Sequence, residues 1–137
     1  MTNPITVEAT IEADRDKVWE MYHDPEAIKE WNAASDDWHT TEAKNDVITG
    51  GTFDYRMEAK DGSMGFNLKG IYDEVVEPEY EMFVLEDGRK VSVSLENVEE
   101  GTHVVVRFEP EHENSREMQA GGWQATLDNF KKYVESA

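Results

Sequence analysis

The stretch GGTFDYRMEAKDGSMGFNLKGIYDEV, residues 50–75, decides the fold class of this 137-residue chain. Its large apolar side chains recur at every second position, which is the period of a half-buried β-strand. One face of the first strand carries Phe53, Tyr55, Met57 and Ala59, and one face of the second carries Met64, Phe66, Leu68, Gly70 and Tyr72. Asp61-Gly62 between them is typical of a hairpin turn. The stretch therefore predicts an antiparallel strand pair with an aromatic face.

The segments that follow continue this pattern. Residues 78–96 predict two more strands around the turn Asp87-Gly88, and residues 97–110 predict a last strand after a turn near Gly101. Three turn signals at short intervals indicate an antiparallel meander rather than a parallel sheet.

The N-terminal segment predicts a strand and two short helices. Residues 5–11 alternate between apolar and polar side chains, as a half-buried strand does. Asp14 is a suitable cap for a first short helix, and Asp24-Pro25 opens a second one that ends at Trp31. Trp38-His39 then begins the next strand.

The C-terminal segment predicts a long amphipathic helix. Its apolar stripe steps by four, three and four residues through Trp123, Leu127, Phe130 and Val134. Asn114 and Glu117 have the spacing of a capping box. Gly121-Gly122 inside the helix costs about 1 kcal/mol per glycine relative to alanine. This cost indicates a kink, the close approach of a bulky group, or a later start of the helix.

This order of elements predicts a single α+β domain over residues 1–137. A curved antiparallel sheet wrapped around the C-terminal helix buries the apolar stripe of that helix. Because a strongly curved sheet cannot meet a straight helix along its whole length, we expect a cavity between Trp123 and the aromatic face of the sheet.

The composition excludes several classes of function. The chain holds 31 acidic residues against 13 Lys and Arg, a net charge of −18, which disfavours nucleic acids and anionic membranes as partners. It has no cysteine and therefore no disulfide, thiolate zinc site or cysteine nucleophile. No apolar stretch reaches the roughly 18 residues of a membrane helix, and no secretory signal is visible at the N-terminus. We expect a cytoplasmic protein.

Several segments together resemble the bacterial heat-shock-protein-90 ATPase activator-like proteins of the SRPBCC or START-like superfamily. The most specific are the Gly50-Gly51-Thr52-Phe53 turn, the Asp87-Gly88-Arg89 turn, and Gly122-Trp123 followed by Leu127 and Phe130. The resemblance covers nearly the whole chain and implies the birch-pollen-allergen-like helix-grip fold, with a deep, mostly apolar pocket between sheet and helix. In the eukaryotic activator, this domain is the smaller C-terminal part, and a separate N-terminal domain makes much of the chaperone contact.

The aromatic residues are the strongest functional feature of the sequence. Ligand sites are usually apolar concavities with a few well-placed polar groups. We expect Trp31 to fill the core and Trp38 to form a cavity wall, while Tyr55 and Gln124 serve as polar anchors. The predicted ligand-binding residues are Trp31, Trp38, Phe53, Tyr55, Met57, Phe66, Tyr72, Trp123, Gln124 and Leu127.

Signals for catalysis are weak in comparison. The four histidines show no H-x-H or H-E-x-x-H spacing, so we expect no metal. No nucleophile elbow or phosphate loop is present, and we expect no cofactor. His39, which follows Trp38 and lies near two aspartates, is a candidate acid–base residue, as is Tyr55.

Three functions remain open at this point. The first is non-enzymatic binding of a small apolar or amphipathic molecule in the cavity. The second is an enzyme of the cyclase or hydrolase kind that uses His39 or Tyr55. The third is a protein-interaction module that acts as a chaperone partner.

Overall fold

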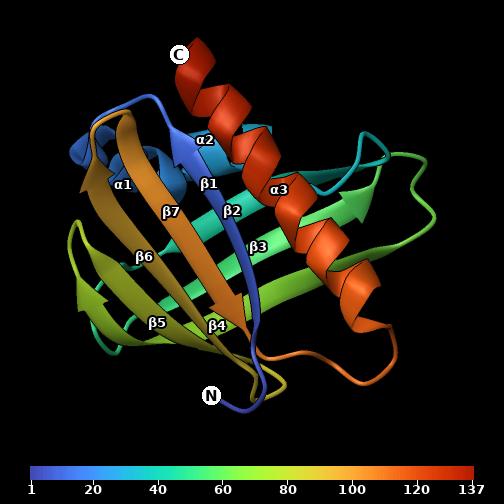
Figure 1. Ribbon diagram of the computed structural model, residues 1–137. Helices are drawn as coiled ribbons and strands as arrows, with labels where there is room; N and C mark the ends of the chain where they lie inside the picture. Colours follow the sequence, from blue (N-terminus) through green and yellow to red (C-terminus); the bar gives the residue numbers. More distant parts are fainter.

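Seven antiparallel strands curl around one long helix in the computed structural model, which describes all residues 1–137 (Figure 1). The elements are β1 (Ile5–Ile11), α1 (Arg15–His23), α2 (Pro25–Trp31), β2 (Trp38–Asn45), β3 (Thr52–Ala59), β4 (Gly65–Val76), β5 (Tyr80–Leu85), β6 (Lys90–Val98), β7 (Gly101–Phe108) and α3 (Arg116–Ser136). The predicted α+β helix-grip architecture, with two short helices after the first strand, is confirmed.

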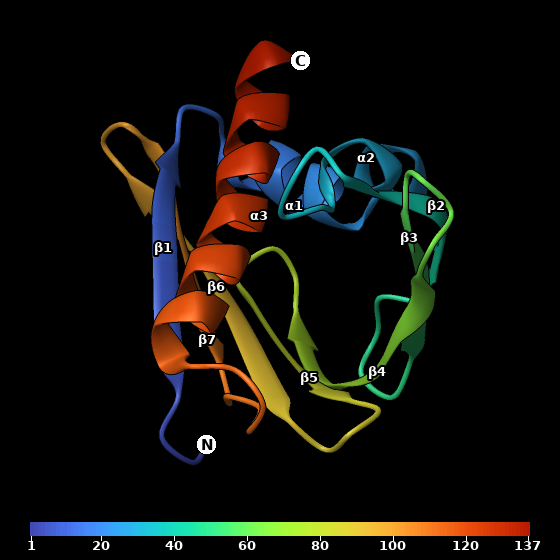
Figure 2. The same cartoon turned by 90° about the vertical axis from the view of Figure 1, so that its right-hand side faces the viewer.

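The strands lie in the order β1-β7-β6-β5-β4-β3-β2, so β1 and β2 are the two edges. The hairpins β3–β4 and β5–β6 turn at Gly62 and Gly88, whose φ angles of 78° and 93° favour glycine. Bulges interrupt the register between Thr40 and Glu42 and between Tyr72 and Glu74. Such bulges increase local twist and bend the strand. The sheet accordingly curls into a half-barrel (Figure 2).

The two short helices cross one end of this half-barrel (Figure 2). The Asp14 side chain accepts a hydrogen bond from the backbone N–H of Lys17, as an N-cap does. Pro25 stands in the first turn of α2, where its missing N–H removes no helical hydrogen bond. Trp31 ends α2 and is 6% exposed, and its Nε1 donates a hydrogen bond to the carbonyl of Met21 at 3.2 Å. Trp31 is therefore a core residue, as predicted.

Helix α3 begins one residue later than the capping-box spacing predicted. Ser115 is its N-cap and accepts a hydrogen bond from the N–H of Met118 at 3.1 Å, whereas the carbonyl of Asn114 accepts one from Gln119. Gly121 and Gly122 lie inside the helix, and a Cβ built at either position meets no atom within 4 Å. Of the three explanations for these glycines, the close approach of a bulky group is therefore excluded, and both positions border open space.

The core lies where the helices meet β1, β7 and β6. Phe130 and Val134 of α3 are buried and belong, with Val18, Trp31 and Val104, to one apolar cluster. Trp123 stacks on Phe108 with ring centroids 4.0 Å apart and planes at 9°. Helix α3 is thus fixed to one half of the sheet only.

None of the helices has the length and apolarity needed to cross a membrane.

Candidate functional site

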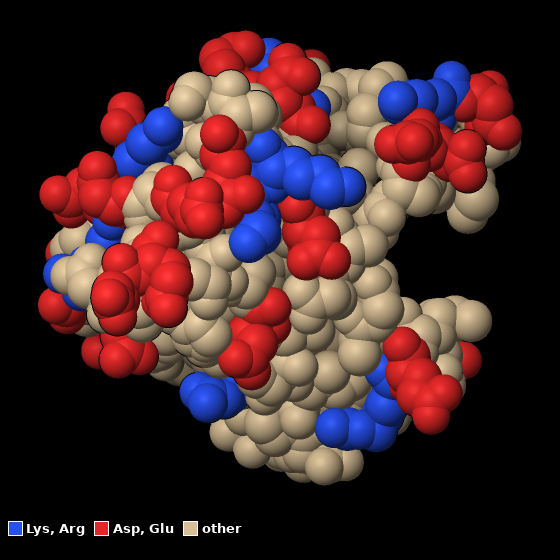
Figure 3. Space-filling view, turned by 45° about the horizontal axis from the view of Figure 1, so that its top comes forward, with Lys and Arg blue, Asp and Glu red and all other residues tan.

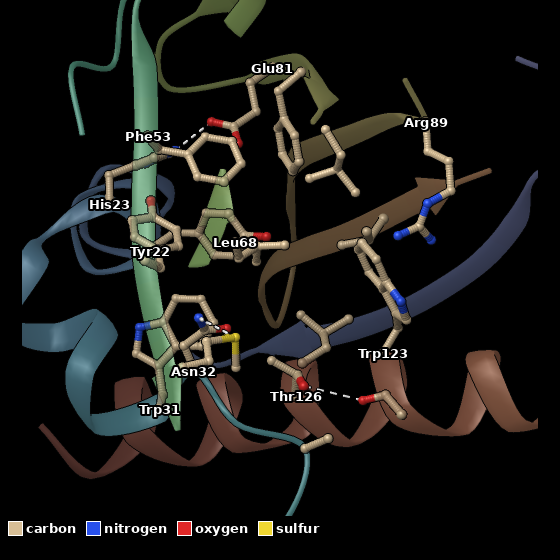
Figure 4. Close-up of a pocket in the computed structure, with 18 of the residues that line it drawn as sticks. Tyr22, His23, Trp31, Asn32, Phe53, Leu68, Glu81, Arg89, Trp123 and Thr126 are labelled. Carbon is tan, nitrogen blue, oxygen red and sulfur yellow. Dashed lines mark hydrogen bonds and ion pairs between the residues drawn. The ribbon is translucent and has the colours of Figure 1, made fainter. Parts of the chain in front are cut away.

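A cavity of about 400 Å³ lies between the inner face of the sheet and α3 (Figure 4). It exists because α3 packs on β1 and on the two short helices, while β3 and β4 curve away from it (Figure 2). Of the 20 residues that line it, 14 are hydrophobic. The surface is hollowed on the same side of the molecule, between two lobes, with acidic side chains spread over the rest of this face (Figure 3).

The apolar wall is built from inward-facing residues of three neighbouring strands. Antiparallel pairing sets Phe53 opposite Gly70, Tyr55 opposite Leu68 and Tyr72 opposite Phe83. The Phe53 ring contacts those of Tyr55, Tyr72 and Phe83 at centroid distances of 5.0, 5.5 and 5.0 Å. A Cβ at Gly70 would lie 2.5 Å from the Phe53 ring, so glycine is what allows this ring to lie against β4.

A hydrogen-bonded ion pair, His23 with Glu81, stands at the inner end of this apolar wall (Figure 4). His23 is 8% exposed and Glu81 1% exposed, and both line the cavity. His23 Nδ1 faces the carbonyl oxygen of Trp19 at 2.8 Å. Since a carbonyl oxygen only accepts, Nδ1 carries a proton, and one further proton lies between Nε2 and the Glu81 carboxylate. The pair is therefore neutral as a whole, which makes its burial tolerable.

Three tyrosines surround this pair. Burial raises the pKa of Tyr55 to about 12, although the hydrogen bond from Asn45 Nδ2 at 3.1 Å acts to lower it. Burial, with a smaller contribution from Glu81, raises the pKa of Tyr22 above its ordinary range. Burial also raises the pKa of Tyr72, as do the neighbouring Tyr55 and Glu81. At neutral pH these hydroxyls stay protonated and can donate hydrogen bonds, so Tyr55 is poorly suited to act as a general base.

The opposite side of the cavity carries a single positive charge. Arg89, in the β5–β6 turn, lines the cavity and directs its guanidinium group toward Trp123 (Figure 4). Its Nε donates a hydrogen bond to Asp87 Oδ2 at 2.8 Å, and its two Nη atoms make no hydrogen bond within the chain. Phe66, which is 47% exposed, and Gly122 border the cavity where it opens to solvent.

The structure brings most of the predicted ligand-binding residues together around one cavity. Those that line it are Trp31, Phe53, Tyr55, Met57, Phe66, Tyr72, Trp123 and Leu127. Two predicted residues lie elsewhere, which corrects the sequence-based expectation for both.

Trp38 is not a wall of this cavity. It is the first residue of the edge strand β2, and its ring packs on Phe66 with centroids 5.9 Å apart. It lines a second hollow, of about 520 Å³, between the α2–β2 connection and the C-terminal half of α3.

Gln124 is not a polar anchor of the cavity. Because it follows Trp123 on the helix, its side chain points about 100° further round the axis. Its Nε2 donates hydrogen bonds to the carbonyl of Glu8 on the edge strand β1 at 3.0 Å and to Asp128 Oδ1 at 2.9 Å.

The two candidate acid–base residues are separated. His39 lines the second, mostly polar hollow together with Lys60 and Lys132, whereas Tyr55 lines the apolar cavity. His39 therefore does not stand beside Tyr55 in one site. No group of three or more His, Asp or Glu side chains in the structure is arranged to hold a metal ion.

Sequence reasoning missed His23, Glu81 and Arg89. For Glu81 a signal was present. In the strand Tyr80–Leu85, side chains alternate between the two faces, so Glu81 lies on the same buried face as Phe83 and Leu85. A carboxylate at an inward position of an apolar strand is unusual and points to a special role. His23 gave no such signal, because only the tertiary fold brings α1 to β5.

Comparisons with known proteins agree with this geometry. The model of the family described as Activator of Hsp90 ATPase homolog 1-like protein matches residues 12–135. A solution structure of an AHSA1-like protein from Aeromonas hydrophila is 44% identical, covers 97% of this chain and 92% of its own, and has a TM-score of 0.92. A protein from Cytophaga hutchinsonii is also 44% identical, with coverage of 98% and 93% and a TM-score of 0.85. A protein from Chromobacterium violaceum, 20% identical with coverage of 97% and 98% and a TM-score of 0.86, shares the fold. Among curated proteins, none matches this chain significantly.

Proposed function

Because this chain belongs to the Activator of Hsp90 ATPase homolog 1-like family, we propose that it is a non-enzymatic binding protein that holds a small apolar or amphipathic molecule in the cavity between sheet and α3. Family and fold support a birch-pollen-allergen-like ligand-binding domain. The observation that carries the proposal is the cavity itself. Its volume of about 400 Å³ lies within the range of roughly 300–1,000 Å³ that is typical of ligand pockets.

The lining supports the same conclusion. A mostly apolar wall with few polar groups favours a molecule with a large apolar body and one or two polar ends. We propose that the ligand contacts the eight predicted residues that line the cavity, together with Tyr22, His23 and Glu81 at its inner end and Arg89 near its opening.

An NMR titration tests this proposal. The protein is titrated with a panel of lipids, flavonoids and aromatic acids while backbone amide shifts are followed. We expect a binding member of the panel to shift the amides of Tyr55, Leu68 and Trp123, and to leave His39 and Lys132 of the second hollow unchanged. If no member of the panel shifts the cavity amides, the proposal is wrong.

The description of the family motivates a second candidate, in which the chain is a protein partner of heat-shock protein 90 and stimulates its ATPase. This candidate predicts direct binding to the chaperone and faster ATP turnover. Unchanged turnover with a large excess of this protein would exclude it. The cytoplasmic location expected from the sequence also stays a prediction, which cell fractionation tests.

A further inference from the structure

Glu81 presents a hydrogen-bond acceptor at the inner end of the cavity. Glu81 Oε1 is engaged by His23, but Oε2 makes no hydrogen bond within the chain, and the residue lines the cavity while being 1% exposed. Oε2 is an acceptor wherever the shared proton lies: it is a carboxylate oxygen in one case and the carbonyl oxygen of the acid in the other. Oε2 can therefore accept a hydrogen bond from a donor group of the ligand.

The opposite side presents two unused donors. The Nη atoms of Arg89 face the cavity beside Trp123 (Figure 4). Of the guanidinium nitrogens, only Nε donates a hydrogen bond to Asp87. Guanidinium groups bind carboxylates through parallel charge-assisted hydrogen bonds, which makes an acid group the suitable partner here.

The sheet fixes the spacing of these two positions. Glu81 and Leu85 face the cavity from the two ends of β5, and the carbonyl of Arg89 accepts a hydrogen bond from the N–H of Leu85 at 2.8 Å. Arg89 thus lies opposite Leu85, so that four residues of strand, roughly 13 Å, separate the two positions along the sheet. Between them the wall is apolar, with Phe83 at its centre.

Resting on the proposed function, we propose that the ligand class is a hydroxylated carboxylic acid, with its hydroxyl group on Glu81 and its carboxylate on Arg89. The apolar body of the ligand lies along Phe53, Phe83 and Trp123. This orientation gives each end of the ligand a partner: an alkyl, ether or ester end offers Oε2 no ligand donor, and the ligand carboxylate meets the only guanidinium group in the lining.

Three probes of equal chain length test this orientation in the unaltered protein by isothermal titration calorimetry. They are ω-hydroxydecanoic acid, decanoic acid, which lacks the hydroxyl group, and decanol, which lacks the acid. Decanoic acid lacks the hydrogen bond to Glu81, and decanol lacks the ion pair with Arg89. Because a hydrogen bond to a charged group contributes about 1.5–3 kcal/mol, we expect the hydroxy acid to bind at least about tenfold more tightly than either of them.

Two sets of variants assign the two ends. Arg89→Gln should weaken both acids and leave decanol unchanged, while Arg107→Gln, which removes an equal charge from an exposed position outside the cavity, should change none of them. The double variant His23→Phe/Glu81→Leu removes both members of the buried pair and leaves neither partner uncompensated. In it, the hydroxy acid should lose its advantage over decanoic acid.

The outcomes separate the two proposals. If decanoic acid and decanol bind in the cavity as tightly as the hydroxy acid, cavity binding stands and the assignment of the ligand class is wrong. If the double variant is folded and keeps the full preference for the hydroxyl group, Glu81 is not its acceptor and the assignment is again overturned. If no probe and no member of the wider panel binds, the proposed function itself fails.

Discussion

The substitution Gly122→Leu should fill part of the cavity without harming the fold. Gly122 lines the cavity on the same side of α3 as Thr126, and a Cβ built there meets no atom within 4 Å. A leucine side chain can therefore extend into space that the ligand would occupy. Gly121, its neighbour, is exposed and does not line the cavity, and provides a matched control with the same backbone and the same substitution.

The two variants should share a gain in stability and differ in binding. Glycine inside a helix is about 0.8 to 1 kcal/mol less favourable than a good helix former, so both variants should unfold at higher temperature. In Gly122→Leu, the four carbons of the new side chain displace about as many ligand carbons. At roughly 0.8 kcal/mol per buried methylene, the affinity falls by about 3 kcal/mol, more than a hundredfold.

Thermal unfolding followed by circular dichroism measures the first effect, and calorimetric titration with decanoic acid measures the second. The reasoning is refuted if Gly122→Leu is folded and binds decanoic acid as tightly as Gly121→Leu does. It is also refuted if Gly121→Leu loses binding to the same extent, because the effect would then come from the helix and not from the cavity.

Further predictions concern stability. Ser115→Ala should lower the free energy of unfolding by about 1 kcal/mol in urea titrations because it removes the N-cap of α3, while Asn114→Ala should have a much smaller effect. Gly70→Ala should destabilise the protein by about 1–3 kcal/mol, because its Cβ would displace the Phe53 ring; a variant as stable as the parent would contradict this packing. The pKa of Tyr55 is raised to about 12 in the folded protein, above its ordinary value of 10 in the unfolded chain. The protonated hydroxyl therefore contributes its full stabilisation below pH 10, and this contribution is lost as the pH rises from about 10 to 12. One pH unit corresponds to about 1.4 kcal/mol per group, so Tyr55 alone accounts for at most about 3 kcal/mol of this loss. Denaturant titrations over this pH range measure it, and Tyr55→Phe should reduce the dependence on pH.

The fold followed from the sequence because its signals are local. Alternation along residues 52–59 and the Asp61-Gly62 turn depend only on neighbouring residues, as does the helix that Pro25 opens. The cap of α3 was misplaced by one residue because Asn114 and Ser115 are both good cap residues. Which of the two caps the helix depends on the tertiary position of the preceding loop.

The site was less accessible to sequence reasoning because it depends on contacts between distant elements. Strand alternation correctly placed Phe53 and Tyr55 on the inner face, but it could not show that the cavity ends before Trp38. The pairing of His23 with Glu81 joins residues 58 positions apart and follows only from the crossing of α1 over the end of the half-barrel.

The most direct test of the central claim is the location of a bound apolar probe by intermolecular NOEs in methyl-labelled protein. With decanoic acid bound, we predict NOEs to the methyl groups of Leu68, Leu127 and Val106, which line the cavity. The account is contradicted if these methyl groups show no NOE to the probe and the methyl group of Ala33, which lines only the second hollow, does.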